Sequence, residues 1–284
     1  MYMYEHFNNI KTLYGNAYVQ IPNDVFKDLT KTIKNNGKPN AQQISFAYAY
    51  LVTIAFLYKY AHFVDVDNGT YIQNKDIKQV LGYGEKTKTV DKIIKKDGIL
   101  EQLRLVHTTK NYPVSVEYTD EIINDVRMRE FITIEMLSDK DAYYKEVKRI
   151  VKNRNYEIKE PLFLFDYKND AGSLYSYENT HKITIDEFLK FIYDGELNNI
   201  DFMLYAFFKY KCHGFLENTR NLALDKIELE IGIGKNTFYK YLEKLEKRNY
   251  VKSIRKGWNS DRNSVIEANE YIFKGISQWN LFYF

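Results

Sequence analysis

A run of cations and hydrogen-bond donors between residues 235 and 244 offers the chemistry needed to contact DNA. Lysine and asparagine side chains bind phosphate oxygens and base edges, and threonine and tyrosine hydroxyls donate to the same acceptors. The residues predicted to make these contacts are Lys235, Asn236, Thr237, Tyr239, Lys240 and Lys244. A face this rich in lysine is also typical of plain solvated surface, so its structural setting must support the interpretation.

The elements predicted around this run have the order of a helix-turn-helix followed by a basic hairpin. Residues 224–231 form a short amphipathic segment, and Gly232 and Gly234 then supply a tight turn. The next helix has a buried face at helical spacing, made by Phe238, Tyr241, Leu242 and Leu245. Strand-like runs flank the turn-rich loop 258–264, which completes the order of a winged helix. The hairpin residues predicted to contact phosphates or the minor groove are Arg255, Lys256 and Arg262.

The N-terminal half repeats this order. A helix over residues 75–81 is followed by a turn at Gly82 and Gly84, and Gly82 lies 150 positions before Gly232. A second helix is predicted over 86–96, and a hairpin with a turn at 109–113 would form its wing. The predicted DNA contacts of this half are Lys86, Thr87, Lys88, Lys92, Lys110 and Asn111. The shared order indicates a diverged structural repeat.

The predicted fold is mainly α with small β-hairpins, an α+β protein with two winged-helix domains in tandem. Residues 44–60 are apolar nearly all round, so we expect a buried helix at the centre of a core. An Asn-Gly turn predicts a hairpin over 63–72, and 120–155 is predicted to be helical. Thr184 is expected to cap a helix over 185–193. The predicted domains are residues 1–120, a connecting helical segment and linker over 121–180, and residues 181–284.

Composition limits the class of protein and its compartment. The 284 residues are 45% hydrophobic, and a formal net charge of only +3 means that any nucleic-acid binding must come from local patches. The single cysteine, Cys212, excludes a disulfide framework and a multi-cysteine zinc site, and is expected in the core. Without a signal peptide or an uninterrupted apolar span, the chain is predicted to be cytoplasmic and free of the membrane.

Familiar enzyme patterns fail on a required residue, so the chain is predicted not to be an enzyme. Gly-Lys-Asn-Thr after the turn resembles a phosphate-binding loop, but Leu229 occupies the position of its first glycine. Tyr241 and Lys244 have the spacing of a DNA-nicking site, whose metal needs two closely spaced histidines. The histidines here are scattered singly: His6, His62, His107, His181 and His213. Asp65 and Asp67 lack the glycine and third acidic ligand of a calcium loop, so no metal or cofactor is expected.

With two such units in tandem, the chain resembles the replication initiators of plasmids and phages of low-GC Gram-positive bacteria. The resemblance rests on this architecture and on the pattern over residues 231–255. It implies a sequence-specific double-stranded DNA-binding protein that binds origin repeats and recruits host replication proteins. The candidate partners are double-stranded DNA, a second copy of the chain in a homodimer, and a host helicase, primase or loader. Two alternatives stay open: a transcriptional or copy-number repressor, and a protein-interaction module of a replication complex.

Overall fold

A computed structural model describes residues 3–37, 40–123, 126–152, 155–164, 179–214, 216–256 and 268–276. Its α-helices are α1 (Tyr4–Tyr14), α2 (Val25–Asn35), α3 (Ala41–Lys59), α4 (Asn74–Val80), α5 (Asp91–Ile94), α6 (Ile99–Gln102), α7 (Ala142–Ile150), α8 (Ile185–Tyr193), α9 (Asn199–Cys212), α10 (Leu224–Ile231) and α11 (Lys235–Lys247). Its strands are β1 (Tyr18–Pro22), β2 (Val64–Asp65), β3 (Thr70–Tyr71), β4 (Val106–Thr109), β5 (Pro113–Ile123), β6 (Val126–Thr133), β7 (Ile158–Pro161), β8 (Thr180–Thr184), β9 (Thr219–Leu222), β10 (Val251–Ile254) and β11 (Asn269–Phe273).

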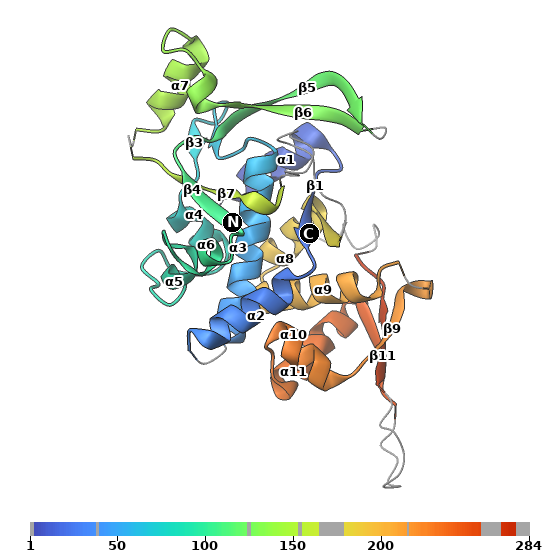
Figure 1. The fold of residues 1–284 in the computed structure, drawn as a ribbon. Coiled ribbons are helices and arrows are strands. Elements are labelled where there is room, and N and C mark those ends of the chain that lie inside the picture. The colour runs from blue at the N-terminus through green and yellow to red at the C-terminus, as the bar shows by residue number, and fades with distance from the viewer. Residues whose placement is uncertain are drawn as a thin grey trace.

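Two long helices, α3 and α9, pack against each other at the centre of the fold (Figure 1). α3 is apolar on every side, and residues 44–59 are all buried, which confirms the helix predicted there. α9 begins with a capping box, in which Asn198 and Asp201 each accept a hydrogen bond from the other residue's backbone N–H. Cys212 at its end is fully buried, as predicted.

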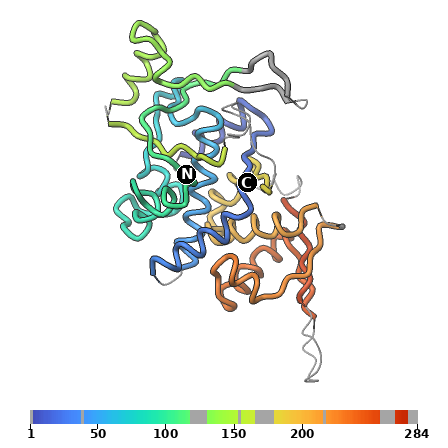
Figure 2. Tube along the Cα trace, in the orientation of Figure 1, coloured from blue at the N-terminus to red at the C-terminus, as the bar shows by residue number. Residues whose placement is uncertain are grey.

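Segments from the two ends of the described chain lie side by side. β1 pairs antiparallel with β8, from Tyr18 opposite Thr184 to Pro22 opposite Thr180. α1 packs on α8 and α2 packs on α10, so the blue segments of Figure 2 adjoin the yellow and orange ones. Each half contains a strand, a helix and a long buried helix in the same order, as β1–α2–α3 and β8–α8–α9. A single cluster of buried residues joins both halves.

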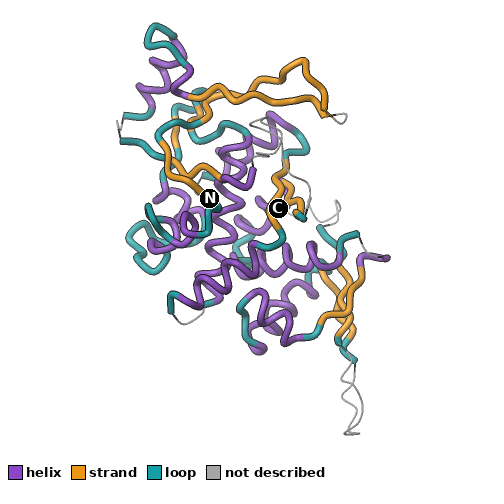
Figure 3. Tube along the Cα trace, viewed as in Figure 1, coloured by secondary structure: helices purple, strands orange, loops and turns teal. Residues whose placement is uncertain are grey.

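The sheets of the described chain are small, and all of their strand pairs are antiparallel (Figure 3). β9, β10 and β11 form a three-stranded sheet with β11 in the middle. β5 and β6 form a long ribbon near α7, while β2 and β3 confirm the short hairpin predicted over 63–72 (Figure 1). The protein is therefore α+β with small antiparallel sheets. Among the described helices, none is both long and apolar enough to cross a membrane.

The hairpin predicted as the N-terminal wing does not form. β4 pairs with β7, from Val106 opposite Pro161 to Thr109 opposite Ile158, whereas β5 pairs with β6. The turn at 109–113 therefore connects strands of two different sheets. Alternation along a strand marks its apolar face but does not specify its partner, and here the partner of β4 lies far downstream in the sequence.

The helix predicted over 86–96 is also wrong, because only the single turn of α5 is helical there. Residues 84–89 contain no apolar side chain that a helix could bury, and packing of an apolar face supplies most helical stability. Instead, Glu85 and Asp91 each contact the ammonium of Lys78. This group donates to the carbonyl of Glu85 at 2.8 Å and pairs with the Asp91 carboxylate at 2.6 Å.

The region between the halves contains less helix than predicted. Among the described residues of 120–155, only α7 is α-helical, and β5 and β6 occupy most of the first part. In contrast, α8 confirms the helix over 185–193: the Thr184 hydroxyl accepts from the N–H of Glu187 at 3.2 Å. Most of the expected linker lies outside the described residues.

Candidate nucleic-acid interface

α10 and α11 are joined by a turn that requires glycine at one position. Gly232 ends α10 with φ 65° and ψ 19°, in the left-handed region, and its N–H donates to the carbonyl of Glu228. A Cβ built on Gly232 would lie 2.6 Å from Cδ1 of Ile44 and 3.0 Å from Cγ2 of Thr30. The turn therefore packs directly on α2 and α3, and this contact positions the start of α11.

α11 buries the apolar face that the sequence predicts. Phe238, Leu242 and Leu245 are fully buried, and the helix packs along α9. The rings of Phe238 and Phe208 of α9 are 6.2 Å apart between centroids. Tyr241 is only half-buried, so its predicted burial is partial. Packing of this face turns the opposite, polar face outward.

The C-terminal half of α11 and Arg248, which follows it, make polar contacts with the connection between α8 and α9. Arg248 forms two parallel hydrogen bonds with the Asp194 carboxylate, at 2.7 and 2.8 Å. Lys244 donates to the carbonyl of Glu196 at 3.2 Å and lies 3.5 Å from Oδ2 of Asp201. Burial raises the pKa of Asp201 above its usual value despite these donors. Lys244, predicted to contact DNA, is thus engaged in contacts within the protein.

The N-terminal half of α11 leaves its predicted contact residues at the surface. Lys235, Asn236 and Lys240 are exposed, and Thr237 and Tyr239 are half-buried. Within the described residues, neither Lys235 nor Lys240 has a carboxylate at ion-pair distance. The helix also begins without a side-chain cap, so its first N–H groups have no side-chain acceptor. Exposed cations beside a helix N-terminus are groups that bind phosphate.

The edge of the three-stranded sheet extends this surface. Ser253 of β10 donates to Oε1 of Glu246 through its N–H at 2.9 Å and its hydroxyl at 2.7 Å, which holds β10 beside α11. The guanidinium carbon of Arg255 lies 4.9 Å from the ring centroid of Tyr239, a cation–π contact. Lys256 follows at the surface. The structure therefore brings the predicted residues of α11 and of the sheet edge together.

The other predicted contact residues are not gathered in this way. Arg262 lies outside the described residues. The exposed residues Lys86 and Lys88 and the half-buried Thr87 lie in turns, and Lys92 is half-buried in α5. The connection from β4 to β5 contains the exposed Lys110 and the half-buried Asn111, whose side-chain oxygen accepts from the N–H of Glu135 at 3.4 Å. In this half, the structure offers a basic loop rather than a long basic helix.

One group of chemically capable side chains was missed from the sequence. His6 and His62 are isolated from each other in the sequence, but the fold brings their ring centroids to 4.4 Å. Both rings also approach the carboxylate of Asp65. Because His6 and His62 are 56 positions apart, no local spacing reveals the cluster.

Comparisons with known proteins identify no relative of this chain. A scan against protein-family models, a search of curated proteins and a search of solved structures each found no match. The function is therefore inferred from the geometry of the chain itself.

Proposed function

We propose that α9, α10 and α11 with the β9–β11–β10 sheet form a winged helix that binds double-stranded DNA, with α11 in the major groove. A winged helix has the order helix, strand, two helices and two strands, and its last strand lies in the middle of the sheet. The order of the elements from α9 to β11 and the central place of β11 support this assignment. We assign sequence-specific contact to α11 because the second helix of such a motif enters the groove.

The division of α11 into two unlike halves carries this proposal. Its C-terminal half is held by ion pairs to the rest of the protein, whereas its N-terminal half presents Lys235, Asn236 and Lys240 to solvent. The N-terminal residues of a recognition helix are the ones that contact base edges. Arg255, in cation–π contact with Tyr239, extends the basic surface along the sheet edge. A phosphate of the bound DNA would lie next to this edge.

Within this class we propose a replication initiator that acts without catalysis of its own. The order strand, helix and long buried helix in both halves supports a duplicated unit, and the resemblance to the initiators also depends on two related units in tandem. The N-terminal half has only the single turn of α5 where a recognition helix would lie. We therefore assign reading of the DNA sequence to the C-terminal half, and contacts with replication partners to the N-terminal half.

A gel-shift experiment with the full chain tests DNA binding. Duplexes that tile the chain's own gene and its flanks are compared with unrelated duplexes of equal length. We expect one or more tiles to form a complex that survives an excess of unrelated DNA. Absence of such a complex on every tile would contradict the proposal and favour the protein-interaction module.

A plasmid-establishment assay separates an initiator from a repressor. A plasmid that lacks its own origin but carries the bound tile should be maintained only in cells that supply the chain. Silencing of a reporter placed beside the tile, without any plasmid maintenance, would instead identify a repressor.

Removal of charge at the sheet edge should weaken binding to all sequences alike. For Arg255→Ala with Lys256→Ala, the slope of log affinity against log salt should fall by about one unit per charge, because each phosphate contact releases a counterion. Affinities measured between low and moderate salt give the slope. Arg149→Ala on α7 removes an exposed charge far from α11 in Figure 1 and should leave the slope unchanged. An unaltered slope in the double variant would place the DNA elsewhere.

A further inference from the structure

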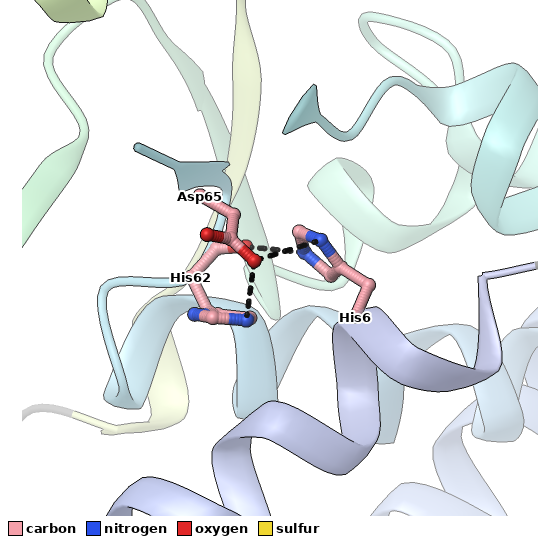
Figure 4. A group of neighbouring side chains, drawn as sticks. All are labelled: His6, His62 and Asp65. Carbon is pink, nitrogen blue, oxygen red and sulfur yellow. Dashed lines mark hydrogen bonds and ion pairs between the residues drawn. The ribbon is translucent and has the colours of Figure 1, made fainter. Parts of the chain in front are cut away.

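Three buried side chains, one from α1 and two from the segment that follows α3, point toward one another at the end of α3 (Figure 4). His6 belongs to α1, His62 follows the C-terminus of α3, and Asp65 lies in β2. Each is only 6% exposed. Nδ1 of His6 lies 3.9 Å from Oδ2 of Asp65, and Nε2 of His62 lies 3.7 Å from the same oxygen. One nitrogen from each ring and one carboxylate oxygen therefore converge.

The hydrogen bonds around the cluster leave the converging nitrogen of His6 with a free lone pair. Nε2 of His6 lies 2.8 Å from the carbonyl of His62, so it must carry the proton and donate it. Nδ1 of His6 is then unprotonated and accepts only a long contact from the Thr70 hydroxyl, at 3.3 Å. A ring nitrogen that donates to a backbone carbonyl while its other nitrogen faces inward is the usual arrangement of a metal-binding histidine.

Nε2 of His62 is a buried polar atom without a hydrogen-bond partner. Its distance of 3.7 Å from Asp65 is too long for a hydrogen bond, so the carboxylate does not satisfy it. A buried polar atom without a hydrogen-bond partner is destabilising. A cation bound between Nε2 of His62 and Oδ2 of Asp65 would interact favourably with both atoms.

The carboxylate of Asp65 is held in place from behind. The backbone N–H of Asn68 donates to Oδ1 at 3.1 Å, and its side-chain amide donates to Oδ2 at 2.9 Å. Asn9 adds a longer contact to Oδ2 at 3.4 Å. Donors of this kind orient a metal-binding carboxylate and keep it ionised. The carboxylate of Asp65 is therefore oriented without a bound ion.

The charge of the cluster suits a divalent cation. A histidine binds a metal ion through the lone pair of its neutral ring, and an aspartate binds as the carboxylate. Two neutral imidazoles and one carboxylate carry a single negative charge, which a buried site must balance.

A cavity of about 500 Å³ adjoins the cluster and gives access to it. His62 and Asp65 line this cavity, together with Asn9 and Tyr143. Asp67 is a further lining residue, and no lysine or arginine of the described chain lines the cavity. A cation can thus enter from a side without positive charge, and water from the cavity can complete its coordination.

We propose that His6, His62 and Asp65 bind one Zn²⁺ ion, with water from the cavity as the fourth ligand. Two imidazole nitrogens and one carboxylate favour zinc over the hard cations calcium and magnesium. Bonds of about 2.0–2.1 Å to a tetrahedral ion would set the ligand atoms about 3.3 Å apart. The present nitrogen–oxygen separations of 3.7 and 3.9 Å would shorten by about 0.4–0.6 Å, and the two ring nitrogens, which lie within 4.8 Å of each other, would also move closer together. The ion would tie α1 to the end of α3, independently of any contact with DNA.

The test measures zinc retained by the purified full-length chain. The protein is stripped with a chelator, incubated with Zn²⁺ and a competing chelating dye, and desalted before its metal content is determined. We expect about one zinc per chain, together with a rise in the thermal unfolding midpoint on addition of zinc. Cobalt in place of zinc should give the visible absorption of a tetrahedral site. A chain that retains no zinc, or that gains no thermal stability from it, would overturn the proposal.

Three variants locate the bound ion. His62→Ala and Asp65→Asn should each abolish retention and the thermal shift, and Asp65→Asn does so while preserving the size of the side chain. His107→Ala removes an exposed histidine of β4 and should retain one zinc. Equal retention by the wild type and Asp65→Asn, or loss of zinc in His107→Ala, would show that the metal binds elsewhere.

Discussion

Gly232→Ala is expected to lower the free energy of unfolding by about 2–4 kcal/mol, because two separate penalties add. An alanine at φ 65° adopts the left-handed conformation, which costs about 1–2 kcal/mol for a residue with a Cβ. The added Cβ would also lie 2.6 Å from Cδ1 of Ile44, which is fully buried, so this side chain would have to shift within the packed core. Urea unfolding of the full chain measures the loss.

Two other glycines separate these penalties. Gly82 has φ 80° with open space around its hypothetical Cβ, so Gly82→Ala should show the conformational penalty alone, about 1–2 kcal/mol. Gly84 lacks a positive φ, and its Cβ would make only an ordinary 3.5 Å contact with Thr87. Gly84→Ala should therefore change stability by less than about 1 kcal/mol. If Gly232→Ala unfolds like Gly82→Ala, the turn does not pack on α3 as described.

Glu101→Gln is expected to destabilise the protein by about 3 kcal/mol, because it leaves a buried ammonium without its charge partner. Nζ of Lys159 on β7 lies 2.7 Å from Oε1 of Glu101 on α6, and the lysine side chain is only 4% exposed. Thr108 of β4 donates to the same carboxylate oxygen. Glu146→Gln on α7 is the matched control. It breaks an exposed pair with Arg149 and should lower stability by less than about 1 kcal/mol.

The loss in Glu101→Gln should depend on pH in one direction. Burial raises the pKa of Glu101, but the hydrogen bond from Lys159 and its neighbours outweighs burial and lowers this pKa from 4.5 to about 2. Its stabilisation is therefore complete above pH 4.5 and disappears as the pH falls toward 2. The difference in unfolding free energy between wild type and variant should shrink over this range. A difference that stays constant would contradict the ion pair.

Local sequence patterns predicted the helices whose boundaries or buried faces follow from residues close together in the sequence. The buried face of α11 follows from Phe238, Leu242 and Leu245, and the start of α8 follows from the cap at Thr184. α3 is long and uniformly apolar, so its central position needed no further information. Of these elements, α11 belongs to the candidate interface, and α3 contacts its turn through Ile44.

Contacts between distant residues account for the failures. β4 takes β7 as its partner rather than the strand that follows it, and no pattern within either strand specifies that choice. The spacing of Val90, Ile93 and Ile94 predicts the helix over 86–96, but the segment has no apolar side chain before Val90 that a helix could bury. His6 and His62 are brought together only because α1 packs near the end of α3. Lys244 looked free for the same reason, since its partners lie in the α8–α9 connection.

The most direct test of whether α11 reads the DNA is the affinity of the full chain for its preferred duplex. Fluorescence anisotropy measures this affinity for the wild type and for α11 variants. Asn236→Ala with Lys240→Ala removes two exposed side chains, and each lost contact should weaken affinity roughly tenfold or more. Lys247→Ala removes a cation from the other end of the same helix, where it pairs with Glu243, and should change affinity by no more than about twofold. Circular dichroism confirms that both variants are folded. We expect the double variant to lose about 100-fold or more in affinity for the preferred duplex, with a smaller loss on unrelated DNA. Unchanged affinity of the folded double variant for every duplex would contradict the assignment of α11 as the DNA-reading helix.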